Sequence, residues 1–153
     1  MQERISFQDT PAGFMNDLLK IGYFIKKAGL DDTLHELINT RASQINGCAY
    51  CLDMHHKDAI ARGETWQRLY SLPAWRETPY YTEKERAVLA YTEALTLTKD
   101  ADDEVFNALS AHFSKDQVAV LTLAVATINT WNILNKAFRT IPGGYKPGMF
   151  DQH

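Results

Sequence analysis

The chain has 153 residues, the usual size of one domain or of one domain with a helical extension. Hydrophobic residues make up 45% and charged residues 23% of the sequence, which is typical of globular domains and excludes the disordered, collagen-like and coiled-coil classes. The formal net charge of -3 lacks the basic excess that binds a phosphate backbone, so we expect no nucleic-acid partner.

The N-terminal segment, the length of the apolar runs and the cysteines bear on where the protein is located in the cell. The N-terminal segment carries charge without a following apolar run, and no later segment has the roughly 18 uninterrupted apolar residues of a membrane span. We therefore expect a cytoplasmic protein that does not enter the membrane. Its two cysteines are Cys48 and Cys51. Because a cytosolic chain of this size needs no stabilising disulfide, two cysteines at this spacing suggest chemistry.

The first half of the chain shows helical spacing of apolar residues. A first helix is expected over about 11–28 with Thr10 as its N-cap, and a second from about Asp32 to the Asn46-Gly47 stop. A third helix begins at the cysteines and ends near Arg62. Residues 64–81 are rich in Trp, Tyr and Pro, and we expect an irregular connection with one short helical stretch, packed on the body.

The second half continues the same pattern. Thr82 and Glu85 form a capping-box signature that opens a fourth helix, a short fifth helix runs from 102 or 103 to Phe113, and a sixth runs from 114 to about 139. No segment alternates apolar and polar residues over the length of a strand, so the fold class is all-α with about six helices. We expect a single domain over 1–153, with a core motif at 33–98, C-terminal helices at 102–139 and an irregular tail at 140–153.

The third helix carries the chemistry. Cys48, Cys51 and His55 share one of its faces, and the cysteines stand at the helix start, where unpaired N–H groups and the helix dipole favour the thiolate. His55 lies one turn after Cys51 and can supply a positive charge or a base. A cysteine pair three positions apart on a helix also holds its Cα atoms near the separation of a disulfide, so the pair can cycle between dithiol and disulfide.

Two other interpretations stay open on this evidence. Cys48 and Cys51 could be small buried hydrophobes, or they could join His55 and either Glu36 or His56 in a metal site. Structural zinc usually draws a second ligand pair from a distant segment, and the chain has no further cysteine. The C-x-x-C spacing in a cytosolic chain favours redox chemistry.

The segment HELINTRASQINGCAYCLDMHHKDAIARG, residues 35–63, resembles the carboxymuconolactone decarboxylase and AhpD-like alkylhydroperoxidase family. The shared pattern is a glutamate, then Arg-Ala-Ser and Asn-Gly-Cys-x-x-Cys, then a histidine four residues on. The similarity is looser from there to about Leu97, and beyond it rests mainly on the Asn-x-Trp-Asn element at 129–132. Because the name-giving decarboxylases lack the cysteine pair, the resemblance indicates the peroxidase branch.

The resemblance implies roles for individual residues in an AhpD-like helical bundle. Cys51 corresponds to the peroxidatic cysteine, Cys48 to the resolving cysteine, His55 to a proton relay and Glu36 to the general base behind them. AhpD carries a histidine immediately before its second cysteine, where this chain has Tyr50, which departs from a relay of two histidines. Tyr50 could donate a hydrogen bond to a peroxide or thiolate, or simply cover the site. Helix electrostatics alone favour Cys48 as the more acidic thiol, so the division of roles rests on the resemblance.

The function expected is a thiol-dependent hydroperoxidase that reduces organic hydroperoxides or hydrogen peroxide through a dithiol/disulfide cycle. It needs no cofactor or metal, and its partners are the peroxide and a thiol or lipoyl-type reductant protein. The alternatives are a non-peroxidatic family member that acts in disulfide exchange, a carboxymuconolactone decarboxylase-like enzyme that keeps the cysteines for structure, and an oligomeric binding module.

Two charged residues of the second helix have contrasting positions. Glu36 lies off the aliphatic stripe, so the amphipathic pattern alone places it in solvent. The resemblance instead requires this helix to be packed on two sides, with Glu36 turned toward the cysteine helix. Arg41 lies within the stripe, and we expect it to pair with a buried carboxylate or to extend to solvent, with no catalytic role.

The sixth helix is the most apolar part of the chain. Nine of the eleven residues at 118–128 are apolar, so this helix should be fully buried, and a chain this short needs a partner subunit to bury it. The family forms homo-oligomers, trimers and hexamers among them. We therefore expect an obligate homo-oligomer, with Asn129, Trp131 and Asn132 as packing or interface residues.

Overall fold

The computed structural model describes residues 2–150, and those residues form helices and no β-strand. The fold class is therefore all-α, as the sequence predicts. The elements in chain order are η1 (Phe7–Asp9), α1 (Phe14–Lys27), α2 (Asp32–Asn46), α3 (Ala49–Ala61), α4 (Trp66–Ser71), η2 (Leu72–Glu77), α5 (Glu83–Thr98), α6 (Asp103–Ser110) and α7 (Lys115–Phe138), where η marks a 3-10 helix.

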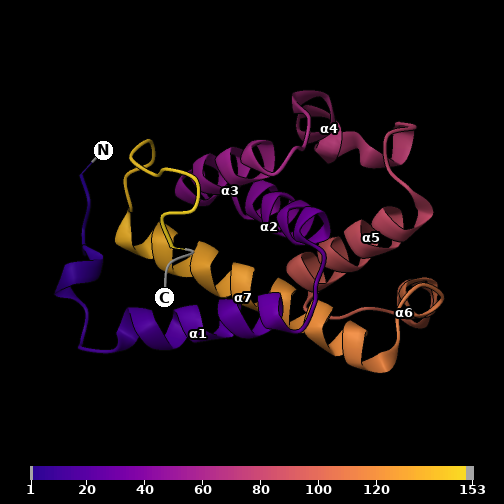
Figure 1. Cartoon of the computed structure of the whole chain (residues 1–153), viewed down its shortest axis with the longest axis horizontal. Coiled ribbons are helices and arrows are strands. Elements are labelled where there is room, and N and C mark those ends of the chain that lie inside the picture. The colour runs from indigo at the N-terminus through magenta and orange to yellow at the C-terminus, as the bar shows by residue number, and fades with distance from the viewer. Residues whose placement is uncertain (1, 151–153) are drawn as a thin grey trace.

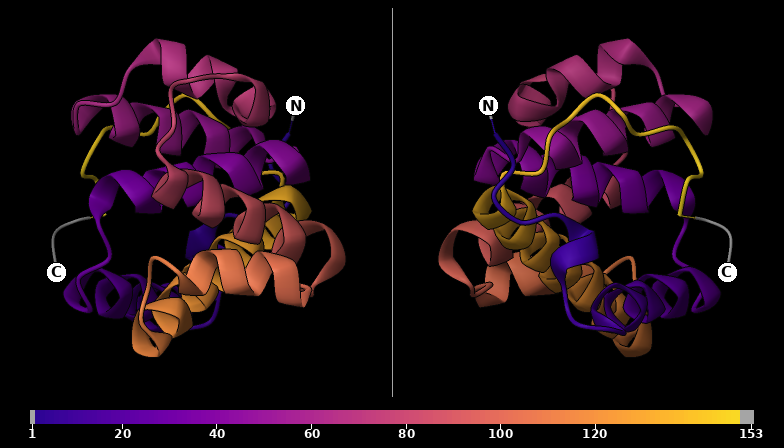
Figure 2. Two further views of the ribbon diagram at one scale, coloured as in Figure 1. Left: turned by 90° about the vertical axis from the view of Figure 1, so that its right-hand side faces the viewer. Right: turned by 90° about the vertical axis from the view of Figure 1, so that its left-hand side faces the viewer.

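Helix α2 is the centre of the arrangement, because it packs against α3, α5 and α7. In Figure 1, α7 runs diagonally through the molecule with α1 on one side and with α2 and α3 on the other. The two end views in Figure 2 place α4 and η2 on the side of α2 that faces away from α1 and α7. The cysteine helix α3 therefore lies beside the longest helix of the fold.

Two apolar clusters hold these helices together. The larger one joins α1, α2, α5, α6 and α7 through buried aliphatic side chains, which include Ile25, Leu34, Ile38, Val88, Leu109, Leu121, Val125 and Ile128. The smaller one consists of Leu37, Leu72, Trp75, Tyr81 and Leu89, and fixes η2 and the loop after it to α2 and α5. The aromatic-rich connection is thus packed on the body, as predicted.

The predicted helices agree with the structure except at a few ends. The first helix begins at Phe14 rather than Pro11, because the Thr10 hydroxyl donates to the Phe7 carbonyl and closes η1 instead of capping α1. Gly13, with φ of 88°, stands at the N-cap in the left-handed region that favours glycine. The fifth predicted helix ends at Ser110, before Phe113. The short stretch expected within 64–81 is helix α4, which brings the number of α-helices to seven among the described residues.

Arg41 is part of a buried ion pair, as expected. Its Nε donates to Oε1 of Glu93 at 2.8 Å, and the same carboxylate accepts from Nε1 of Trp75 at 2.9 Å and from Arg76 at 2.5 Å. The Glu93 side chain is only 9% exposed. This carboxylate therefore links α2, η2 and α5 through charge-assisted hydrogen bonds.

Helix α7 is not fully buried within one chain, which corrects the prediction in part. Its buried residues pack on the other helices, but a stripe of Ala119, Ala126, Thr130, Ile133 and Ala137 is exposed, and Ile133 retains 68% of its surface. Among the described residues α7 is the one helix long and apolar enough to cross a membrane. Core helices of soluble proteins meet the same criterion, but only part of α7 is buried within one chain.

Candidate active site at the start of helix α3

A sharp turn places the two cysteines at the start of α3. Gly47 ends α2 with φ of 63°, a conformation that glycine adopts at little cost, and this confirms the predicted Asn46-Gly47 stop. Cys48 then stands at the N-cap of α3 in an extended conformation, and its sulfur accepts a hydrogen bond from the Cys51 N–H at 3.4 Å. The unpaired N–H groups of the first turn therefore surround the cysteine pair.

The two cysteines form a disulfide, with Cα atoms 5.4 Å apart. That separation is well within the range of ordinary disulfides, as the spacing of three residues on a helix predicts. Cys48 is 1% exposed and Cys51 is fully buried. The pair is thus shielded from solvent, and no free thiol is available as a metal ligand in this state.

Glu36 is buried and lies against His55, so the solvent-facing position suggested by the amphipathic pattern is wrong. One carboxylate oxygen lies 2.9 Å from Nδ1 of His55, and the other accepts a hydrogen bond from Arg62. Helix α2 is packed on two sides, with Thr40 and Ser43 also buried. Burial opposes ionisation of Glu36, but the charge and hydrogen bond of His55, with His35 and Arg62, together lower its pKa.

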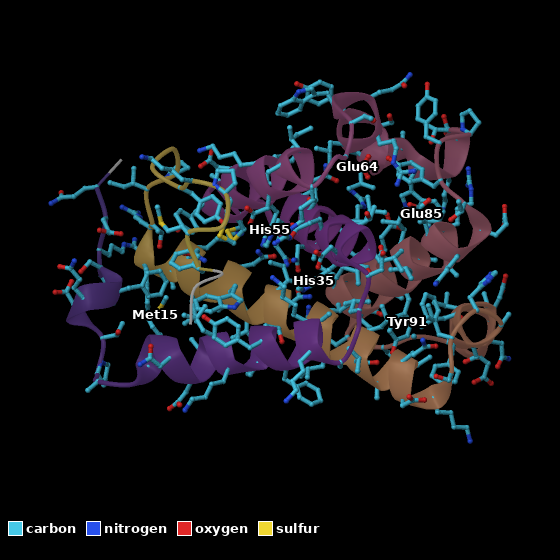
Figure 3. The ribbon with its side chains drawn as sticks, viewed as in Figure 1. Met15, His35, His55, Glu64, Glu85 and Tyr91 are labelled. Atoms are coloured by element: carbon cyan, nitrogen blue, oxygen red, sulfur yellow. A yellow bond between two sulfur atoms is a disulfide. The ribbon has the colours of Figure 1, made fainter. Side chains whose placement is uncertain are left out.

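A cavity of about 180 Å³ opens beside this pair, between α1, α2, α3 and α7. Cys51, His55 and Glu36 lie in its wall, whereas Cys48 does not. Most of the remaining wall is apolar, and is formed by Phe7, Met15, Leu19, Tyr23, Met54, Ile128, Trp131 and Phe150 among others. Figure 3 shows His55 beside the yellow disulfide, with Met15 toward the N-terminal end of α1. The cavity thus brings the cysteine Cys51 and the Glu36–His55 pair to an apolar ligand.

Tyr50 also lines the cavity and is half-buried. Burial, with the negative charge of Asp53, raises the pKa of its phenol. The phenol therefore stays protonated at neutral pH and can donate a hydrogen bond into the cavity. His56, an alternative metal ligand in the sequence analysis, bonds instead to the Leu52 carbonyl of its own helix.

Three residues of this region escaped the sequence analysis, and His35 is the first. It lines the cavity one position before Glu36, and burial lowers the pKa of its imidazole. Its position in the helix gave no sign of a role. His55 of α3 lines the same cavity, and Figure 3 labels both histidines.

Asp58 is the second, and it joins the site to the C-terminal tail. The Tyr145 hydroxyl donates to the Asp58 carboxylate at 2.8 Å, and the Gly148 N–H donates to it at 3.3 Å. Burial raises the pKa of Asp58, and the charge of Glu36 acts in the same direction. Its spacing of three residues after His55 was the available sequence signal, since it places Asp58 near the same helix face.

Asn135 of α7 is the third. Its side-chain Nδ2 lies 3.6 Å from Sγ of Cys51 and also donates to the Trp131 carbonyl at 2.9 Å. Asn129 and Asn132 are predicted to be packing or interface residues, and Asn132 indeed bonds to Ser43 and to Asn46 on α2. Asn135 follows Asn132 at the helical spacing of three, a signal that could have placed it on the same face.

The acidic and imidazole groups also bear on metal binding. Glu36, His55 and Asp58 offer ligand atoms that all lie within 4.8 Å of one another. However, Glu36 already accepts from Arg62, and Asp58 already accepts from Tyr145. A cation there would have to compete with a guanidinium and with these hydrogen bonds, so the donor set favours proton transfer over metal binding.

Comparisons with known proteins show the family and the fold of the chain. The model of the carboxymuconolactone decarboxylase family matches residues 7–94. The uncharacterized protein YdfG of Bacillus subtilis is 37% identical over 139 residues, which cover 90% of this chain and 95% of YdfG.

Solved structures show the same fold. ATU0492 of Agrobacterium tumefaciens, a protein of unknown function proposed to be the antioxidant defence protein AhpD, has a TM-score of 0.89 and 35% identity, covering 94% of this chain and all of that one. The debrominase Bmp8, solved with 2,3,4-tribromopyrrole, has a TM-score of 0.76 at 19% identity, covering 84% of this chain and 70% of that one. At that identity the likeness to Bmp8 concerns the fold alone.

Proposed function

The chain belongs to the carboxymuconolactone decarboxylase family, and we propose that it is a thiol-dependent hydroperoxidase that works through the Cys48–Cys51 pair. The observation that carries the proposal is the position of Cys51, whose sulfur lines an apolar cavity beside the hydrogen-bonded Glu36–His55 pair. The similarity to ATU0492, itself proposed to act in antioxidant defence, supports a peroxidase-related role.

Cys51 is the proposed attacking sulfur and Cys48 the resolving one. Helix electrostatics favour Cys48, which is nearer the N-terminus of α3. Access to the cavity favours Cys51, because Cys51 is part of the cavity wall and Cys48 is not. A peroxide must reach the sulfur that it oxidises, so access decides between them.

The proposed reaction balances as follows. The Cys51 thiolate attacks one oxygen of the hydroperoxide, and the S–O bond forms while the O–O bond breaks. Cys51 becomes a sulfenic acid, and the alkoxide takes a proton and leaves as the alcohol. The Cys48 thiol then gives up its proton and attacks the sulfenic sulfur; the S–S bond forms, the S–O bond breaks, and the leaving hydroxide takes that proton and departs as water. An external dithiol supplies two electrons and two protons to restore both thiols.

The Glu36–His55 pair is the proposed proton carrier. With Nδ1 of His55 donating to the Glu36 carboxylate, Nε2 of the ring is left to take the proton of the Cys51 thiol and to return it to the alkoxide. Arg62 holds the second carboxylate oxygen and so fixes the orientation of Glu36. Tyr50 replaces the histidine of AhpD as a proposed hydrogen-bond donor to the peroxide.

The cavity wall favours organic hydroperoxides over hydrogen peroxide. Its aromatic, methionine and aliphatic side chains gain free energy when they cover an apolar group, at roughly 25 cal/mol per Å². Hydrogen peroxide has no such group. We therefore expect a higher kcat/KM for a bulky apolar hydroperoxide.

The wider setting is also proposed. A thiol or lipoyl-type reductant protein would restore the dithiol, in the cytoplasm and without a cofactor or metal. The exposed apolar stripe of α7 supports a homo-oligomer, a trimer or hexamer, in which a second copy covers it.

Hydroperoxide consumption tests the function. Wild type and Cys51→Ser are given cumene hydroperoxide or hydrogen peroxide with dithiothreitol as reductant, and peroxide loss is followed. We expect turnover by wild type, faster with the organic peroxide, and none by Cys51→Ser. Turnover that survives the substitution would exclude the proposed mechanism. No turnover by either protein would contradict the function and favour disulfide exchange.

A further inference from the structure

The buried side-chain amide of Asn135 contacts the proposed attacking sulfur and has no part in the reaction described above. Asn135 lies on α7, is 5% exposed and lines the cavity with Cys51 and His55. Its Nδ2 lies 3.6 Å from the Cys51 sulfur. Helix α7 therefore supplies a polar group, from outside the C-x-x-C motif, that contacts the sulfur of Cys51.

The hydrogen bonds of this amide fix its orientation. Nδ2 donates to the Trp131 carbonyl oxygen at 2.9 Å, and a carbonyl only accepts. The reverse orientation would place two acceptor oxygens in contact, so the nitrogen must face Trp131. One N–H therefore goes to Trp131, and the second is directed at the Cys51 sulfur.

The other end of the amide has no partner. Oδ1 of Asn135 is buried and accepts no hydrogen bond from any group that the structure describes. A buried carbonyl oxygen without a donor costs free energy, and most such groups in proteins are satisfied. This oxygen is covered, but Asn135 is part of the cavity wall, so a ligand that enters beside the sulfur and displaces the covering groups can satisfy it with an O–H group.

We propose that Asn135 is a further catalytic residue, whose N–H stabilises the Cys51 thiolate and whose Oδ1 accepts the O–H of the hydroperoxide. The inference rests on the proposed function. An N–H donor strengthens when its acceptor becomes charged, so the contact favours the thiolate over the thiol. The hydroperoxide O–H, held by Oδ1, keeps its terminal oxygen beside Sγ. The alkoxide then leaves toward the imidazole of His55.

Two measurements on Asn135→Leu separate the two roles. Alkylation of the reduced protein by iodoacetamide, followed at Cys51 by mass spectrometry as a function of pH, reports the thiolate alone. We expect the thiol pKa to rise and the rate at pH 7 to fall by about tenfold, the size of one charge-assisted hydrogen bond. The kcat/KM for cumene hydroperoxide should fall further, because peroxide reduction also uses Oδ1.

Asn129→Leu is the matched control, since Asn129 lies on the same helix and bonds to Thr96 and Asn46 but not to the sulfur. It should leave both rates near those of wild type. Asn135→Ala removes the amide without added bulk, and serves if the leucine variant does not fold.

The outcomes distinguish this inference from the proposed function. An unchanged alkylation profile in the Asn135 variants would overturn the role of the N–H, and equal losses in both assays would overturn the role of Oδ1. Equal losses in Asn129→Leu would show a general packing effect and overturn both. If wild type reduced no hydroperoxide, the proposed function would be wrong. The alkylation profile would still test the contact between the Asn135 N–H and the Cys51 sulfur, because it does not depend on peroxide reduction.

Discussion

The ionisation state of each acidic side chain at the site depends on its immediate neighbours, as Glu36 illustrates. A carboxyl that is 4% exposed would be neutral if burial acted alone. His55, His35 and Arg62 reverse that effect and lower its pKa, so Glu36 is a carboxylate at neutral pH. Asp58 lies close by and accepts hydrogen bonds from Tyr145 and Gly148, but burial and the charge of Glu36 raise its pKa. The environment thus shifts the pKa values of two neighbouring carboxyl groups in opposite directions.

Replacing Glu36 by Gln should slow the ionisation of Cys51. The amide is neutral and no longer stabilises a protonated His55, so the imidazole draws the thiol proton less effectively. We expect roughly tenfold slower alkylation of the reduced protein by iodoacetamide at pH 7, within the usual range for a lost acid–base partner. Glu64→Gln is the control, because Glu64 pairs with Arg68 of α4 and does not line the cavity; Figure 3 shows it on the α4 side of the molecule. Equal rates in the Glu36 variant and wild type would remove Glu36 from the relay.

At the scale of elements, the helices were predictable where local signals are strong. The capping box at Thr82 and Glu85 and the glycine at 47 are local chemistry, and both are present in the structure. The start of α1 was not predictable, because the Thr10 side chain bonds backward into η1. The position of Glu36 depends on tertiary packing, which the periodicity of one helix does not contain, because α2 is buried on two faces. The spacing of Asn135 after Asn132 indicates a shared helix face, but its contact with Cys51 depends on how α7 packs against α3.

The Arg41–Glu93 contact joins elements far apart in sequence, and its loss should be visible in stability. Burial opposes ionisation of Glu93, but Trp75, Arg76 and Arg41 lower its pKa. Its contribution to stability is therefore complete above the ordinary pKa of 4.5 and is lost as the pH falls through the lower, folded-state value. Glu93→Gln should cost about 3 kcal/mol at pH 7, the low end for breaking a buried ion pair.

Urea unfolding at pH 7 and at several values below pH 4.5 checks this prediction. The difference in the free energy of unfolding between wild type and Glu93→Gln should shrink as the pH falls, because the wild-type carboxylate becomes protonated. Glu104→Gln, an exposed position on α6, should differ from wild type by less than about 0.5 kcal/mol. A difference for Glu93→Gln that stays constant with pH would mean that the ion pair contributes nothing.

At the scale of the whole molecule, the exposed stripe of α7 requires an explanation. Leaving a few hundred Å² of apolar surface in water forgoes several kcal/mol at roughly 25 cal/mol per Å², which is comparable with the net stability of a domain. A second copy of the chain would recover that free energy. Light scattering at low micromolar concentration should therefore give a mass well above the 17.4 kDa of one chain.

Ile133→Glu should disrupt that assembly, because it places a charge in the centre of the stripe. Leu97→Glu, at a side chain on α5 with a similar exposed fraction of 66%, is the matched control and should keep the wild-type mass. A wild-type mass of one chain would contradict the homo-oligomer and make the stripe a surface for a different protein.

The central claim is that Cys51 attacks the peroxide, and trapping the sulfenic acid tests it most directly. Reduced Cys48→Ser, which cannot form the disulfide, is treated with one equivalent of cumene hydroperoxide and then with dimedone, which adds to sulfenic acids. We predict a dimedone adduct on Cys51, and none on Cys48 when Cys51→Ser is treated in the same way. An adduct on Cys48 in that variant, with Cys51 unmodified in the first, would contradict the account.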